Sequence, residues 1–197
     1  MNKKDQYPLF CLLVFIAVFI WAAINPLYPR DWFLESILSI IAVPTLVLTY
    51  KKFRFSNTSY TLILIFMILQ AIGSHYTYGS VPINLITKMF SFSRNHYDRF
   101  VHFMFGVLWY LPILEICRSL VRFKSKFTVY LAPVLIITAL GSIFEVLEWL
   151  VAIIVEPELG IAYLGTQGDQ WDAQKDMVLK IIGSSIAAFI FLKNSKN

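Results

Sequence analysis

Histidine and carboxylate side chains recur at helical spacing inside apolar stretches of this sequence. Asp98 and His102 are four residues apart, and Glu145 and Glu148 are three apart. A helix would carry each pair on one face. Ionisable side chains are costly at membrane depth, so they usually face the interior of a helix bundle, where they find partners or mark a functional site. The two pairs are therefore candidates for chemistry.

Asp172 and Asp176 form a third pair at a spacing of four, and His96 precedes the first pair. Imidazole and carboxylate groups are ligands that zinc and manganese accept, and they are also common general acids and bases. We expect either a divalent transition metal or an acid and base pair, although no compact ligand motif such as HExxH is present. The candidate metal ligands are His96, Asp98, His102, Glu148, Asp172 and Asp176, and the candidate catalytic residues are His102, Glu145, Glu148 and Asp176.

Structural roles compete with these assignments. Asp98, Asp169 and Asp172 stand where the cap and first turn of a helix favour acids. Asp176 and Lys180 are four apart and could form an ion pair within one helix. A lone histidine in a membrane helix is more often a hydrogen-bonding residue between helices than a ligand. The sequence leaves both interpretations open.

The elements that position these residues follow from hydrophobicity. Hydrophobic residues make up 58% of the 197 residues and charged residues only 15%, which excludes an ordinary soluble domain. The apolar residues form six runs, each close to the roughly 20 residues that a helix needs to cross about 30 Å of hydrocarbon. We predict an all-α membrane protein, a bundle of six transmembrane helices in a single integral-membrane domain. The predicted spans are 9–27, 32–50, 60–77, 98–118, 128–155 and 172–192, and the domain is 1–197.

Basic residues gather at alternate ends of the predicted spans. Most of the 17 Lys and Arg residues lie at the N-terminus, in the second and fourth connections, or at the C-terminus. Cytoplasmic connections are enriched in Lys and Arg, so both termini are predicted to be cytoplasmic. Because the basic residues flank spans instead of forming one face, nucleic acid is not expected as a partner. The residues on the predicted cytoplasmic side are Lys3, Lys4, Lys51, Lys52, Arg54, Arg118, Arg122, Lys124, Lys126, Lys193 and Lys196.

This orientation brings the candidate residues to one membrane face. His102, Glu148 and Asp176 would lie about one or two helical turns of about 5.4 Å below the periplasmic surface. We therefore expect a shared polar chamber that opens to the periplasm. The connection before the last span, at 165–176, is rich in glycine and hydrogen-bonding side chains, and it is expected to be either a lid or a simple turn. The longest connection, 78–97, could hold an interfacial turn of helix.

Four segments of the sequence resemble the YjdF family of bacterial inner-membrane proteins. They are GSHYTY at 73–78, RNHYDRFVHF at 94–103, EVLEW at 145–149 and the segment 165–177, and the resemblance extends over the whole chain. It implies a bacterial inner-membrane location and a multi-pass topology, but no reaction. The segment 98–103, with Glu145, Asp172, Asp176 and Gly183, also resembles the VanZ-like membrane proteins linked to glycopeptide tolerance.

Three classes of function remain in competition. The first is an enzyme at the periplasmic leaflet that uses the histidine and carboxylate groups on an amphiphilic or lipid-linked substrate. The second is a proton-coupled transporter in which the same groups relay protons, although neither a clear internal repeat nor a pair of interrupted spans is present. The third is a structural or assembly protein whose polar residues tie helices together.

Overall fold

The computed structural model describes residues 3–82, 89 and 94–194. These residues form seven α-helices and one 3-10 turn, with no strand among them, so the all-α prediction is confirmed. The elements are α1 (Lys3–Ala23), α2 (Pro29–Thr49), α3 (Asn57–Tyr76), η1 (Tyr78–Ser80), α5 (Tyr97–Leu120), α6 (Lys126–Ile154), α7 (Pro157–Leu164) and α8 (Asp172–Asn194).

Five of these helices, α1, α2, α3, α5 and α6, are long and apolar enough to cross a membrane. Helix α8 occupies the sixth predicted span and is 23 residues long. It does not reach the same apolarity, because its first half carries Asp172, Lys175, Asp176 and Lys180. The six-span prediction is thus confirmed for five helices.

The helix ends differ from the predicted ends where local capping decides them. The first span was predicted to reach residue 27, but α1 ends at Ala23, since Asn25 has a positive φ of 49° and Pro26 follows. Two other helices begin earlier than predicted because serines cap them. The Ser56 hydroxyl accepts a hydrogen bond from the Ser59 amide, and the Ser125 hydroxyl accepts one from the Phe127 amide.

The third and fifth connections contain structure that the hydrophobic pattern did not indicate. The short helix α7 begins at Pro157 and ends at Gly165, whose φ of 57° is the left-handed conformation that often closes a helix. In the longest connection Tyr78–Ser80 form the turn η1, and a position of this turn at the membrane interface stays a prediction. Residues 83–88 and 90–93 of that connection, which include Asn84 and Lys88, lie outside the described residues.

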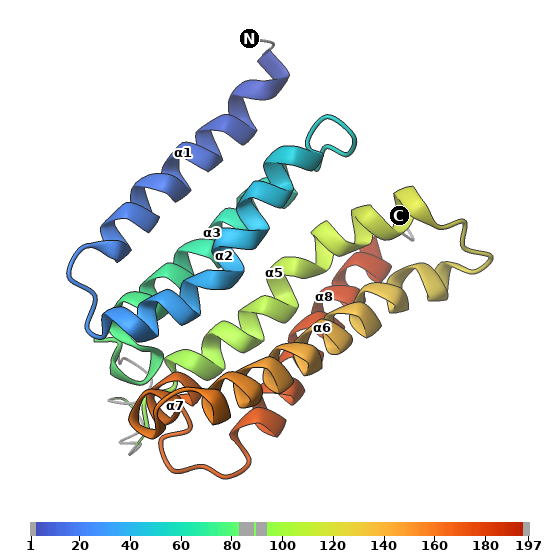
Figure 1. Cartoon of the computed structure of the whole chain (residues 1–197). Helices are drawn as coiled ribbons and strands as arrows, with labels where there is room; N and C mark the ends of the chain where they lie inside the picture. Colours follow the sequence, from blue (N-terminus) through green and yellow to red (C-terminus); the bar gives the residue numbers. More distant parts are fainter. Residues whose placement is uncertain (1–2, 83–88, 90–93, 195–197) are drawn as a thin grey trace.

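The helices form two groups that meet at α3 and α5 (Figure 1). Helices α1 and α2 pack on α3, and α5, α6 and α8 pack on one another, while α7 contacts both α6 and α2. Figure 1 also shows the N-terminus and the C-terminus toward the same end of the bundle. The three long helices α5, α6 and α8 enclose an apolar core at that end, with Tyr110, Leu114 and Ile137 fully buried.

Two glycines bring α5 and α8 into close contact. A Cβ atom on Gly106 would collide with the backbone of Lys180, and one on Gly183 would collide with the backbone carbonyl of Phe103. Small residues allow helix backbones to approach in this way. The contact holds the Asp98 and His102 face of α5 directly against α8.

Candidate functional site

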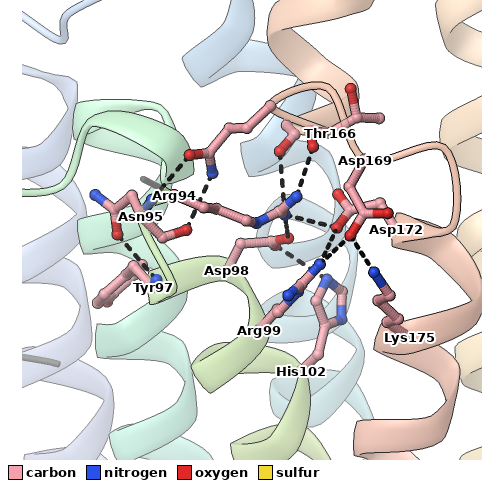
Figure 2. A network of polar contacts seen from close by, with 12 residues as sticks. Arg94, Asn95, Tyr97, Asp98, Arg99, His102, Thr166, Asp169, Asp172 and Lys175 are labelled. Carbon is pink, nitrogen blue, oxygen red and sulfur yellow. Dashed lines mark hydrogen bonds and ion pairs between the residues drawn. The ribbon is translucent and has the colours of Figure 1, made fainter. Parts of the chain in front are cut away.

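The site begins with Asp98 and His102 in the first two turns of α5. His102 Nε2 lies 3.1 Å from Asp98 Oδ1, and both side chains are about nine-tenths buried (Figure 2). The predicted pair on one helical face is therefore formed. A carboxylate that bonds one ring nitrogen fixes the orientation of the imidazole and its tautomer.

Asp176 of α8 completes a three-residue cluster with this pair. One ligand atom each from Asp98, His102 and Asp176 lies within 4.8 Å of the others, and the Asp176 side chain is 2% exposed. Asp176 Oδ1 is buried and has no hydrogen-bond partner within the described part of the chain. A buried oxygen without a partner is costly, so a proton or a cation is the natural complement to this cluster.

Two arginines lie over the cluster from the α5 side. Arg94 Nη2 lies 2.6 Å from Asp172 Oδ1 and 3.6 Å from Asp98 Oδ2. Arg99 forms an ion pair with Asp169 and approaches Asp172 Oδ1 at 3.3 Å (Figure 2). Arginine presents several donors in a fixed fork, which suits it to bridging carboxylates on different elements. The ion pairs therefore join the start of α5 to the start of α8.

The segment between α7 and α8 is also held to the residues just before α5, by hydrogen bonds between side chains and backbone. Arg94 Nη1 donates to the Thr166 carbonyl at 2.5 Å. The Gln167 amide pairs with the Asn95 backbone, accepting from Asn95 N at 2.9 Å and donating to Asn95 O at 3.0 Å. These bonds place residues 165–169 over the site. A lid was one of the two expectations for this segment.

Asp169 lies just before α8 and contacts three partners. Its Oδ2 lies 2.5 Å from Lys175 Nζ, its Oδ1 accepts from the Trp171 amide at 3.1 Å, and it pairs with Arg99. The hydrogen bond from Lys175, then the one from the Trp171 amide, lowers the pKa of Asp169 to about 2. Asp169 is thus a fixed negative charge that caps α8, as the capping alternative expected.

Lys180 pairs across helices. An ion pair of Lys180 with Asp176 within one helix was one of two alternatives, but the Lys180 ammonium forms a buried ion pair with Glu145 of α6. Its aliphatic stem passes over Gly141, which has no side chain to obstruct it. This pair leaves Asp176 free to face His102.

The structure brings only some of the predicted site residues together. Asp98, His102 and Asp176 come together, and Asp172 lies beside them through the two arginines. Glu145 is occupied by Lys180, and Glu148 stays outside the three-residue cluster, half-buried on α6. His96 precedes α5, where burial and then the Arg99 and Arg94 cations lower its pKa. The functional roles of all these predicted site residues stay predictions.

Sequence reasoning missed two acids on α2. Asp31 is 1% exposed and Glu35 is 6% exposed. Asp31 Oδ2 accepts a hydrogen bond from Thr77 at 2.7 Å, while Asp31 Oδ1 has no partner among the described residues. The sequence did contain a sign of this pair, because the two acids are four residues apart in an apolar run, as Asp98 and His102 are.

Comparison with known proteins places the chain among membrane proteins. The model of a family described as predicted membrane protein (DUF2238) matches residues 7–197. The chain is similar to the inner membrane protein YjdF of Escherichia coli K12, with 30% identity over 181 residues, which are 91% of this chain and 86% of that protein. The expected resemblance to the YjdF family is thus confirmed, while the VanZ-like resemblance stays a prediction. No solved structure matches.

Proposed function

Since this chain belongs to the DUF2238 family of membrane proteins, we propose that it is a six-span inner-membrane protein with a metal-dependent site near the periplasmic face. The metal ligands are Asp98, His102 and Asp176. The substrate is an amphiphilic or lipid-linked molecule that reaches the site from the outer leaflet of the inner membrane. The chain forms a single membrane domain.

Helix α8 is the sixth span in this proposal. Its charged residues are compatible with the membrane because α5 and α6 bury them, with Asp172, Asp176 and Lys180 each no more than 4% exposed. Charges inside membrane bundles are tolerated when they face the interior and are paired. An even number of crossings agrees with the two termini lying toward the same end of the bundle (Figure 1). The basic residues of the connections at that end support a cytoplasmic N-terminus and C-terminus.

The unpartnered Oδ1 of Asp176 is the observation that carries the metal site. It belongs to a cluster with one imidazole and two carboxylates, a mixed donor set that zinc and manganese accept. A divalent metal held there would supply Lewis acidity and a bound water of lowered pKa. The side chains of the protein would position the site: Asp98 orients His102, and the arginines hold Asp98 and Asp172 in place.

Complementation of a deletion phenotype tests the enzyme hypothesis. His102→Ala and Asp176→Asn are expected to reach wild-type abundance in the membrane yet fail to restore function, since they remove ligands without touching the apolar core. His75→Ala is the matched control, because His75 stacks on Trp21 away from the cluster. Full complementation by both site variants would overturn the proposal. A loss of abundance equal to the loss of function would instead favour polar residues that only tie helices together.

Proton-coupled transport is the second candidate, and one observation favours it. The buried Lys180 and Glu145 pair lies close enough to the cluster for Lys180 to act electrostatically on Asp98 and His102. Linked buried titratable groups of this kind can pass protons between helices. Accumulation of a solute in sealed vesicles that is lost in Glu145→Gln would support this candidate over the enzyme.

A further inference from the structure

A cavity of about 320 Å³ lies between α1, α2 and α3, in the group of helices that does not hold the three-residue cluster. Its lining includes Cys11 and Phe15 of α1, Val43 of α2, and Ile63 and Met67 of α3. None of the described residues that line it belongs to α5 or α8, which carry the cluster. The cavity is therefore separate from the candidate metal site.

Two contacts join α1 to α2, one on each side of this cavity. Toward the connection between the two helices, the ring centroids of Phe19 and Trp32 lie 5.7 Å apart. Toward the N-terminus, the Tyr50 hydroxyl donates a hydrogen bond of 2.5 Å to Asp5 Oδ1. Between these contacts the lining of the cavity runs from Val43 to Tyr50, which is about 10 Å along the helix axis. The cavity thus extends along the helices, in the direction in which a lipid chain lies.

Apolar side chains form nearly all of the cavity wall. Among the described lining residues only Asp5 carries a charge, and its carboxylate is bonded to Tyr50. A water molecule in a cavity needs about two to four polar partners, and the wall offers them mainly at the end with Asp5, Tyr50 and Tyr60. Protein interiors are close-packed and seldom keep a void larger than a water molecule. Hydrocarbon is therefore the natural occupant of the cavity.

The cavity also opens to the outer surface of the bundle. Leu9 of α1 and Val47 of α2 line it, yet these side chains are 37% and 52% exposed. Both helices are long and apolar enough to cross a membrane, so their outer surface faces lipid in the proposed topology. A lipid chain can therefore enter the cavity from the bilayer without crossing water.

Basic residues adjoin the polar end of the cavity. Lys51 and Lys52 directly follow Tyr50 and are exposed, and Arg54 comes two residues later. These three basic residues stand against the single acid Asp5 of the lining. Lys and Arg residues next to a membrane span attract anionic lipid head groups. The charge at this end therefore favours an anionic lipid over a neutral one.

We propose that the cavity between α1, α2 and α3 binds one acyl chain of an anionic phospholipid, whose head group lies beside Lys51 and Lys52. The lipid belongs to the leaflet at the end of the bundle toward which both termini lie (Figure 1). In the orientation proposed above, this is the cytoplasmic leaflet. The lipid site needs neither a metal nor the residues of the three-residue cluster.

Lipid binding to the full-length protein tests this site. The protein is purified in a steroid-based detergent, so that no flexible detergent chain competes, and native mass spectrometry follows its titration with dioleoylphosphatidylglycerol. Wild type should bind about one molecule per chain, at least about tenfold more tightly than phosphatidylcholine with the same acyl chains. Equal affinities of wild type for the two lipids would overturn the proposal.

A filled cavity is the second part of this test. Leu46 lines the cavity, so Leu46→Trp should weaken the binding of phosphatidylglycerol at least about tenfold. Leu48→Trp is the matched control on the same helix, because Leu48 is 79% exposed, and it should bind as wild type does. Wild-type binding by Leu46→Trp would overturn the proposal. Should Leu46→Trp fold poorly, Val43→Phe is the second filling variant, and unchanged binding there would also overturn it.

Charge removal tests the position of the head group. The double variant Lys51→Gln with Lys52→Gln should bind phosphatidylglycerol no more tightly than phosphatidylcholine. Arg122→Gln with Lys124→Gln is the control, since these two residues are exposed in the connection between α5 and α6, and it should keep the wild-type preference. A preference that survives in the Lys51 and Lys52 variant, or that is lost equally in both double variants, would overturn the proposed position.

Discussion

His102 and Asp98 face each other across one turn of α5, with Nε2 of the histidine 3.1 Å from Oδ1 of the acid. Asp176 reaches the same pair from α8, because Gly106 and Gly183 let the two helices approach closely. The geometry of the cluster therefore depends on a backbone contact as much as on the ionisable groups.

Substitution of Gly183 by alanine should destabilise the protein. The added Cβ would meet the carbonyl of Phe103, so α5 and α8 must separate, and overpacking of this kind costs about 1–3 kcal/mol. Thermal unfolding in detergent measures the change. Ser185→Ala on the exposed side of α8 is the control and should leave Tm nearly unchanged. An unaltered Tm in Gly183→Ala would contradict the close contact.

Replacing one partner of the Lys180 and Glu145 ion pair should lower the free energy of unfolding more than replacing both partners. Lys180→Met alone or Glu145→Leu alone leaves one buried charge unpaired, and such changes cost about 3–5 kcal/mol. The double variant should recover most of that loss, because no charge remains. Stability of the four proteins in a double-mutant cycle is the measurement, and strictly additive losses would show that the two side chains do not interact.

Arg94→Met should loosen the segment that covers the site. The variant loses the bond to the Thr166 carbonyl and the ion pair with Asp172, so amide hydrogen exchange at 165–171 should rise several-fold. Arg30→Met is the matched control, since Arg30 pairs with Glu156 on the exposed surface, where ion pairs contribute little. Exchange that stays at the wild-type rate in Arg94→Met would mean that other contacts hold this segment.

Low pH should lower the stability of the folded protein through protonation of Asp169. Its pKa is about 2 in the folded protein, below the ordinary value of 3.8. Because the folded pKa is depressed, the stabilisation is present above about pH 3.8 and is lost as pH falls toward 2. The Tm of Asp169→Asn should therefore fall less steeply than that of wild type over this range. Parallel curves for the two proteins would contradict the assigned shift.

Much of the fold follows from hydrophobic pattern alone, whereas the partners across helices do not. The helices containing Asp98, Glu145 and Asp176 were predicted because long apolar runs and helical spacing are local properties of the sequence. The choice of Glu145 instead of Asp176 as the partner of Lys180 depends on how α6 and α8 are rotated against each other. No spacing within one helix contains that information.

The acids of α2 illustrate a second limit. Asp31 and Glu35 have the same spacing as the predicted pair on α5, but no histidine accompanies them, and their burial comes from packing against α3 and α7. Helix α7 itself is only 8 residues long and lies in a connection, where hydrophobic runs are too short to indicate a helix. Short helices within connections therefore cannot be predicted from long apolar runs.

The metal content of the purified protein is the direct test of the metal site formed by Asp98, His102 and Asp176. Wild type, His102→Ala and Asp176→Asn would be measured by elemental analysis after incubation with zinc or manganese and removal of excess metal, with His75→Ala as the control. We expect about one metal ion per chain in wild type and His75→Ala, and a loss of most of it in both site variants. A well-folded wild type without metal, or metal retained in both variants, would contradict it.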